Sequence, residues 1–132
     1  MSYLLDTDIC IYWLKGREVV RQNVLARSWS TLAICVITVG ELYYGAYNSQ
    51  KVEKNLERAK QFVSSMRVLP LEITALDTYG RLKSQLRRAG EPLADLDLLI
   101  ASIAIANNRI LVTNNLRHYE RISDLQLQNW TV

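Results

Sequence analysis

The chain has 132 residues, of which 49% are hydrophobic, and these values are typical of one globular domain with a sizeable core. We therefore interpret residues 1–132 as a single domain. No apolar stretch reaches the roughly 20 residues that span a bilayer, and the first residues lack the pattern of a signal peptide, so we expect a cytoplasmic protein without membrane contact. The net charge of +3 and the isoelectric point near 9.0 are compatible with a nucleic-acid partner, although many other proteins are as basic.

The few residues of the usual metal-binding and nucleophilic types exclude several kinds of site. His118 is the only histidine, which excludes every mechanism that needs two imidazoles. Cys10 and Cys35 lie in apolar segments without a metal-binding spacing, so we interpret them as reduced core residues. One histidine and two cysteines do not complete a structural zinc site. Any catalysis should therefore use carboxylates.

The first half of the chain alternates short β-rich runs with helical segments. Residues 3–6 begin an apolar run that predicts a central strand buried on both faces, followed by a short helix that ends at Gly16. Residues 18–27 indicate a basic helix, residues 31–36 a second strand and residues 37–49 a further helix.

The second half continues this alternation. Residues 51–66 predict an amphipathic helix, and Pro70 indicates that the next strand lies at a sheet edge. The helix predicted for residues 73–90 has its apolar stripe at Leu76, Tyr79, Leu82 and Leu86. Residues 93–108 predict a buried helix, residues 109–115 a buried strand, and the remainder one turn of helix and a last strand near Trp130. This order favours a three-layer α/β/α domain with a mainly parallel central sheet.

Five of the thirteen acidic residues lie in segments that otherwise look buried: Asp6, Asp8, Glu41, Asp95 and Asp97. Asp6 follows the first strand, and Thr113 to Asn115 follow a later one. Glu41 and Asp97 come soon after the expected breaks at Gly40 and Pro92, near the predicted starts of two helices. In an open parallel sheet, ligands bind in the crevice at the carboxyl ends of the strands. We therefore expect Asp6, Glu41 and Asp97 to converge there.

Such a convergence needs a counterion. Two carboxylates about 5 Å apart repel by roughly 3 kcal/mol at an effective dielectric constant near 20, and desolvation adds to this cost. Oxygen ligands suit Mg²⁺ or Mn²⁺, which could bind a phosphate group and activate water for phosphodiester hydrolysis. The alternative is that these acids cap helices or pair with arginines. Asp95 and Asp97 project to different sides of a helix; we assign Asp97 to the site, while a helix N-cap remains open for Asp95.

Four segments resemble the PIN-domain nucleases, and among them the VapC toxins. These segments are LLDTD at residues 4–8, VITVGELYYGA at 36–46, LADLDLLIASIAIA at 93–106 and ILVTNN at 110–115. The resemblance implies a Mg²⁺- or Mn²⁺-dependent endoribonuclease that cleaves structured RNA, commonly tRNA or ribosomal RNA. It also implies a homodimer and inhibition by a cognate antitoxin of the VapB type. Tyr43, Tyr44 and Tyr47 are then candidates for antitoxin contacts, or are simply core and rim residues.

The resemblance also assigns roles to individual residues. Asp6, Glu41 and Asp97 match the acidic metal ligands, and Asn115 stands at the fourth acidic position, where an amide adds no negative charge. Thr113 matches the hydroxyl residue beside the site, and Asp8 occupies a position that could support the first acid. The candidate RNA-binding residues, each of which could equally be a solvated surface charge, are Lys15, Lys83, Arg87 and Arg88. His118 fits a structural or rim position.

Two other functions are compatible with parts of this pattern. Asp6-Thr7-Asp8 after a first strand also occurs in haloacid-dehalogenase-like phosphotransferases, but these need a paired acidic motif after a later strand. The neutral Asn115 makes a PIN-like module that binds RNA or protein without cleavage a further alternative. RNA cleavage that stops with chelator separates the nuclease from both.

Overall fold

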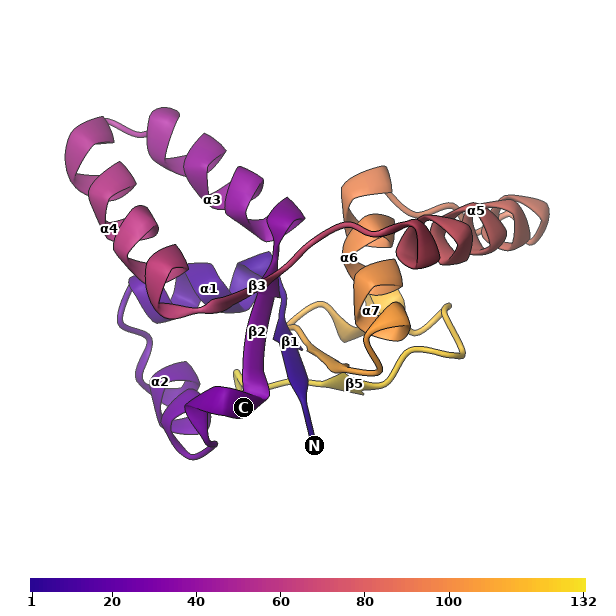
Figure 1. Ribbon diagram of the computed structural model, residues 1–132, viewed down its shortest axis with the longest axis horizontal. Coiled ribbons are helices and arrows are strands. Elements are labelled where there is room, and N and C mark those ends of the chain that lie inside the picture. Colours follow the sequence, from indigo (N-terminus) through magenta and orange to yellow (C-terminus); the bar gives the residue numbers. More distant parts are fainter.

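The computed structural model describes residues 1–132 and contains one five-stranded sheet (Figure 1). Its strand order is β3-β2-β1-β4-β5, and all four pairings are parallel. The strands are β1 Tyr3–Leu5, β2 Leu32–Cys35, β3 Arg67–Leu69, β4 Ile110–Val112 and β5 Leu127–Gln128. The first strand is therefore central, and the strand before Pro70 lies at an edge, as the sequence predicted.

Seven α-helices cover the two faces of this sheet, which confirms the predicted three-layer α/β/α class. They are α1 Thr7–Leu14, α2 Glu18–Leu25, α3 Val36–Tyr47, α4 Val52–Ser65, α5 Ile73–Arg88, α6 Asp95–Ala106 and α7 Leu116–Tyr119. Figure 1 shows α1 to α4 on one side of the sheet and α5 to α7 on the other, with α5 reaching outward from the body. No helix is long and apolar enough to cross a membrane.

Each face of the sheet has its own hydrophobic core, because successive strand side chains point to opposite faces. Leu4 packs with residues of α5 and α6, whereas Tyr3 and Leu5 pack with residues of α1 to α4. Cys10 and Cys35 are buried and unpaired, as expected. Strands β1, β2 and β4 are buried on both sides, which explains why their sequences are continuous apolar runs rather than alternating ones.

Glycine ends two helices and lies inside a third. Gly16 and Gly90 follow α1 and α5 with φ angles of 77° and 70°, a region that favours glycine, so both predicted helix ends are confirmed. Gly40, in contrast, lies within α3, and the expected break there is wrong. Glu41 is consequently in the middle of a 12-residue helix rather than near its start.

The apolar stripe predicted for α5 is only half right. Leu82 and Leu86 are buried, but Leu76 is 43% exposed and its neighbour Ala75 is buried in its place. Helix α6 is more deeply packed, because small residues such as Ala101 and Ala104 allow close contact with the sheet and α5. This packing fixes the first turn of α6, which carries Asp97.

The sheet reverses its strand order at β1 and β4. Leu5 of β1 pairs with Val112 of β4, and the backbone N–H of Asp6 donates to the Val112 carbonyl at 2.9 Å. The chain leaves these two strands in opposite directions, toward α1 and toward α7. Asp6 and Thr113 are therefore neighbours at the position where ligands bind in open parallel sheets.

Candidate active site at the carboxyl ends of β1 and β4

Asp6 is a buried carboxylate that also begins α1. It is 6% exposed and occupies the N-cap position, where its Oδ1 accepts a hydrogen bond from the Thr7 N–H at 2.8 Å. Its Oδ2 accepts from the Thr113 hydroxyl at 2.9 Å. Both oxygens thus have neutral donors, and no cationic side chain pairs with them. The sequence correctly predicted a carboxylate at the end of the central strand.

Asp8 lies two residues after Asp6, in the first turn of α1, and contacts the segment after β4. Its Oδ2 accepts from the Asn114 N–H at 3.0 Å and from the Thr113 hydroxyl at 3.3 Å. Its Oδ1 accepts from the Ile9 N–H at 2.7 Å. The Thr113 hydroxyl consequently lies between two carboxylates. It can donate its single proton to only one of them at a time.

Asp97 approaches from the other side of the sheet, in the first turn of α6. Its Oδ2 lies 3.0 Å from Nε2 of His118, and its Oδ1 accepts from the Tyr119 hydroxyl at 3.4 Å. Both partners come from α7, which directly follows the β4 segment. The Asp97 side chain therefore lies at the contact between α6 and α7.

Glu41 reaches the same region from α3 through a chain of hydroxyl groups. The Thr7 hydroxyl donates to Oε1 of Glu41 at 2.6 Å and lies 3.0 Å from the hydroxyl of the fully buried Thr38. Since Thr7 is adjacent to Asp6, these contacts connect Glu41 to the start of α1 through Thr7.

Burial and like charges disfavour ionisation in this region. Burial of the Asp6 carboxyl, together with the charge of Asp8 and to a smaller extent that of Asp97, raises its pKa from 3.8 to about 7. Burial also raises the pKa of Asp8. The pKa of the Tyr119 hydroxyl is raised by burial and by the charges of Asp6 and Asp97, so this phenol remains protonated and can only donate to a carboxylate. The site is thus an anionic crevice that would favour a cation.

The chemistry of these side chains fits a hydrated divalent cation better than a closed metal cage. No three His, Cys, Asp or Glu side chains lie close enough together to hold a metal ion by themselves. Mg²⁺, however, usually keeps several waters and binds only one or two carboxylates directly. Asp6 and Asp97 provide such carboxylates, and Glu41 can reach an ion through one of its waters.

The remaining sequence candidates have different surroundings. Asn115 is exposed and begins α7, and its backbone N–H, rather than its amide side chain, donates to the Thr113 hydroxyl at 3.0 Å. Asp95 is not an N-cap, because that position is Ala94; Asp95 instead pairs with Lys83 at 2.8 Å on the surface. An RNA phosphate that binds Lys83 must therefore compete with the Asp95 carboxylate.

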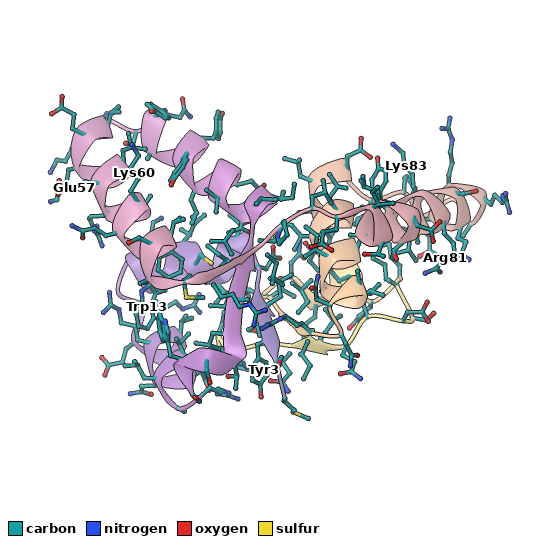
Figure 2. The ribbon with its side chains drawn as sticks, viewed as in Figure 1. Tyr3, Trp13, Glu57, Lys60, Arg81 and Lys83 are labelled. Atoms are coloured by element: carbon teal, nitrogen blue, oxygen red, sulfur yellow. The ribbon has the colours of Figure 1, made fainter.

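The other candidate cations lie on two separate surfaces. Arg87 and Arg88 share the last turn of α5 with exposed side chains, whereas Lys15 follows α1. Lys15 lines a hollow beside α4, and Figure 2 shows that Lys60 of α4 and Lys83 of α5 lie at opposite ends of the molecule. The structure therefore places Asp6, Asp8 and Asp97 in one region but does not gather the four cations into one patch.

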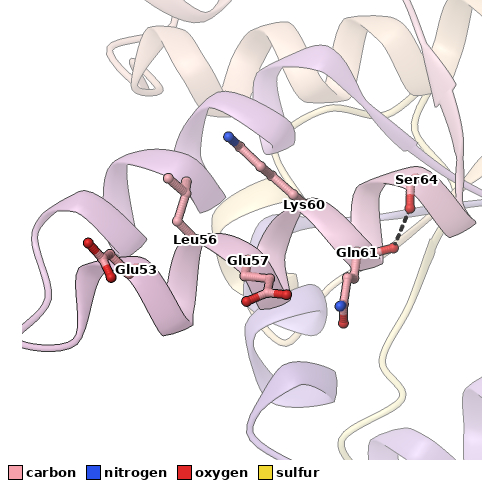
Figure 3. A pocket seen from close by; sticks show the side chains of 6 residues that line it. All are labelled: Glu53, Leu56, Glu57, Lys60, Gln61 and Ser64. Atoms are coloured by element: carbon pink, nitrogen blue, oxygen red, sulfur yellow. Dashed lines mark hydrogen bonds between the residues drawn. The ribbon is translucent and has the colours of Figure 1, made fainter.

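Surface hollows lie around the acids rather than on them. One, of about 490 Å³, is on the outer face of α4, as Figure 3 shows, and its lining includes none of the candidate site residues. A second, of about 390 Å³, lies between α1, α3 and α4, and its lining includes Glu41, Lys15 and Arg58. A third, of about 230 Å³, is lined by Lys83 and Arg87 beside the start of α6. Only the second one reaches a candidate site acid.

Sequence reasoning missed two residues of the site and one contact. His118 was interpreted as structural or as a rim residue, and Tyr119 received no role, yet both contact Asp97. A usable signal was their position, three and four residues after Asn115, where one helical turn returns the chain toward the strand end. The contact between Thr7 and Glu41 had no signal in the sequence, because the two residues are 34 positions apart.

Comparison with known proteins assigns this arrangement to a family. The model of the PIN domain matches residues 3–125. The chain belongs to the PIN-domain family. Ribonuclease VapC2 of Rickettsia felis is 38% identical over 133 residues, with 98% of each chain covered. The tRNA(fMet)-specific endonuclease VapC of Shigella flexneri is 34% identical over 131 residues, with 99% of each covered. The resemblance to VapC proteins of the PIN-domain family is therefore confirmed.

Solved structures agree with this PIN-domain assignment. A chain in the crystal structure of VapBC2 from Rickettsia felis, bound to a DNA fragment from the promoter, superposes with a TM-score of 0.91 and 35% identity, covering 98% of this chain and 99% of that one. A chain of DNA-bound VapBC from Salmonella typhimurium gives a TM-score of 0.92 and 34% identity, with 98% of each chain covered. The fold and the sequence motifs thus lead to the same family.

Proposed function

We propose that this PIN-domain protein is a metal-dependent endoribonuclease, the toxin of a type II toxin–antitoxin pair, and that its substrate is tRNA. The observation that carries the proposal is the meeting of Asp6 and Asp97 from opposite sides of the sheet at the carboxyl ends of β1 and β4. The names of the full-length relatives support ribonuclease action, and the name of the Shigella flexneri relative supports tRNA.

Asp6 and Asp97 are the proposed direct ligands of the cation, and Glu41 is proposed to hold it through a bound water. We propose Mg²⁺ or Mn²⁺ on the basis of these oxygen atoms. When bound, a divalent cation lowers the pKa of a bound water and neutralises charge on a phosphate group. The Thr113 hydroxyl and the Thr7 N–H fix the two oxygens of Asp6, so that this carboxylate faces the crevice in one orientation. Asp8 competes for Thr113 and thereby couples the segment after β4 to Asp6.

His118 and Tyr119 give Asp97 a defined orientation in the same proposal. Tyr119 donates to one oxygen of Asp97, and His118 contacts the other. Asn115, at the fourth position of the family pattern, contributes through its backbone N–H to Thr113. The exposed cations Lys15, Lys83, Arg87 and Arg88 are proposed to bind RNA phosphates away from the scissile bond.

The test uses purified protein and a tRNA pool with Mg²⁺ or Mn²⁺. We expect cleavage that stops on addition of EDTA and disappears in Asp6→Asn and Asp97→Asn, while the matched variant Asp77→Asn, exposed on α5, cleaves like the parent. Asp6→Asn or Asp97→Asn with parental activity would contradict the proposed site. Binding of tRNA without any cleavage, at either metal, would instead identify a non-cleaving RNA-binding module.

The groove beside Glu41 is the proposed binding site of a VapB-type antitoxin. Its floor includes Leu42 and Ala46 of α3 and Ala59 of α4, and the exposed Tyr44 and Tyr47 lie on the same helix α3. The related crystal structures are of VapBC from Rickettsia felis and Salmonella typhimurium, which supports such a partner. Ala46→Trp should fill the groove and weaken antitoxin binding in calorimetry, whereas Gln61→Ala on the outer face of α4 should not.

We also propose a homodimer, because the resemblance to the VapC toxins implies one. Size-exclusion chromatography with light scattering would test it. A particle mass equal to that of one chain over the micromolar range would contradict the proposal.

A further inference from the structure

We propose that Thr7 is a positioning residue that sets the distance between Glu41 and Asp6 through its hydroxyl and its backbone N–H. The inference rests on the proposed function, because it concerns the acids of that site. Thr7 is the first residue of α1 and is half-buried at the crevice. It is the one residue whose hydrogen bonds reach both acids, since its N–H donates to Asp6 at 2.8 Å and its hydroxyl donates to Glu41 at 2.6 Å.

The direction of the hydroxyl chain follows from the number of protons available. An ionised carboxylate accepts hydrogen bonds only, so the single proton of the Thr7 hydroxyl is donated to Oε1 of Glu41. The contact of 3.0 Å between Thr7 and Thr38 must then run the other way, with Thr38 as donor. The fully buried Thr38 thus orients the Thr7 hydroxyl, and Thr7 orients Glu41.

This arrangement fixes one oxygen of Glu41 and leaves the other without a hydrogen-bond partner. Oε1 is the atom bonded to Thr7, while no side-chain or backbone donor contacts Oε2. Thr38 lies three residues before Glu41 on the same face of α3, so the chain of hydroxyls also fixes the orientation of this helix toward α1. A long glutamate side chain is otherwise flexible and loses conformational entropy when it is held in place. With Oε1 held, Oε2 is available to a water of the bound cation.

The experiment measures Mn²⁺ affinity directly, by electron paramagnetic resonance of free Mn²⁺, and RNA cleavage in parallel. Thr7→Val keeps the size and the N–H but loses the hydroxyl, and Thr7→Ser keeps the hydroxyl. We expect Thr7→Val to weaken Mn²⁺ binding by about 10-fold or more, as hydrogen-bond partners of metal ligands typically do. Thr7→Ser should remain within about threefold of the parent, because it restores the same donor.

Two further variants separate positioning from a general effect on folding. Thr78→Val removes a buried hydroxyl from α5, which bonds only to the Thr74 carbonyl, and should leave Mn²⁺ affinity unchanged. Thr7→Ala provides a second test if Thr7→Val does not fold, because alanine is favourable in a first helical turn. Thermal unfolding of each metal-free variant reports its stability.

Glu41→Gln distinguishes failure of this inference from failure of the proposed function. If Thr7 acts through Glu41, Thr7→Val has little additional effect in a Glu41→Gln background, and the two losses are not additive. Parental Mn²⁺ affinity in both Thr7→Val and Thr7→Ala, with a large loss in Glu41→Gln, would overturn the role of Thr7 alone. Parental affinity and cleavage in Glu41→Gln would overturn the assignment of Glu41 in the proposed function as well.

Discussion

The two edges of the central sheet both carry buried charges, but they satisfy them differently. At the amino edge, the guanidinium of Arg109 donates to the carbonyls of Tyr3 and Thr31 at 3.0 and 3.2 Å, which connects the starts of three strands. At the carboxyl edge, Asp6 is as deeply buried, yet it is surrounded by Asp8 and Asp97 and receives only neutral donors. Both charges have neutral hydrogen-bond partners, but one like charge, Arg67, acts on Arg109, whereas two, Asp8 and Asp97, act on Asp6.

This difference separates a structural charge from a functional one. The Arg109 guanidinium donates to two carbonyl oxygens, and these hydrogen bonds offset part of the cost of burial, which together with the charge of Arg67 lowers the pKa of Arg109. The Asp6 carboxylate raises the free energy of the folded, metal-free protein, because its ionised form is desolvated and repelled. Burial alone therefore does not identify a functional charge; a large pKa shift caused by burial and two like charges, as at Asp6, does so more specifically.

The largest expected effect would break this comparison at the carboxyl edge. Asp6→Asn removes the charge but keeps the shape and one hydrogen-bonding oxygen, so the fold should persist while RNA cleavage falls by roughly a thousandfold, the loss of several kcal/mol of transition-state stabilisation. A cleavage assay at saturating Mg²⁺ measures this change. The control Asp77→Asn should cleave at the parental rate, and equal rates for both variants would show that the carboxyl edge carries no chemistry.

Asp6→Asn should lower RNA cleavage but raise the stability of the metal-free protein at neutral pH. Because the folded-state pKa of Asp6 is about 7 and its ordinary value is 3.8, the folded state holds a proton that the unfolded state has lost at intermediate pH. Stability should therefore decrease as the pH rises from about 4 to about 7, by an amount on the order of 4 kcal/mol for the full shift.

Asp6→Asn should lack this part of the pH dependence. We expect the variant to be more stable than the parent at pH 8 in EDTA and nearly equal to it at pH 4, in urea unfolding followed by circular dichroism. Saturating Mg²⁺ should stabilise the parent more than the variant, because binding to the folded state adds stability. Parallel pH profiles for the two proteins would contradict the assigned ionisation of Asp6.

A smaller effect is expected at the amino edge, where a substitution should lower stability and leave RNA cleavage unchanged. Arg109→Met should lower the free energy of unfolding by about 2 kcal/mol, because buried carbonyls lose a charged donor, while cleavage well below the unfolding temperature should be retained. Arg67→Met, at an exposed residue of β3 whose like charge lowers the pKa of Arg109, is the comparison variant and should not destabilise the protein, because it removes that repulsion. Loss of cleavage in folded Arg109→Met would mean that the amino edge is coupled to the site.

Much of this contrast could be predicted from the sequence, and the remainder depends on tertiary contacts. Asp6 could be placed at the end of the central strand because the preceding residues are a continuous apolar run, which fixes both burial and direction. Asp97 could be placed because the apolar residues after it require a buried helix. In both cases, the local pattern and the fold constrain the same residue.

The contacts of His118, Thr7 and Arg109 had no comparable local pattern. Each joins segments that are far apart in the chain, such as Thr7 with Glu41 or Arg109 with Tyr3, so only the packed structure reveals the partner. The break expected at Gly40 was wrong for a related reason: α3 packs through Leu42 and Ala46, and this packing outweighs the roughly 1 kcal/mol cost of a glycine within a helix.

The smallest expected effect concerns an exposed charge pair that belongs to neither edge. Lys83 and Asp95 are bonded at 2.8 Å on the surface, with the side chains 46% and 60% exposed, so solvent screens their interaction and Asp95→Asn should leave the unfolding temperature almost unchanged. The substitution frees Lys83 from its carboxylate.

If Lys83 binds RNA phosphate, tRNA affinity should rise about twofold at low salt, and Lys83→Met should reduce the salt dependence of binding by about one phosphate contact. A second exposed ion pair serves as the matched control. It joins Arg81, on α5 like Lys83, to Asp124 in the loop after α7, at 3.6 Å. If Asp124→Asn increases tRNA affinity as much as Asp95→Asn does, the gain reflects net charge alone, and Lys83 is a solvated surface residue.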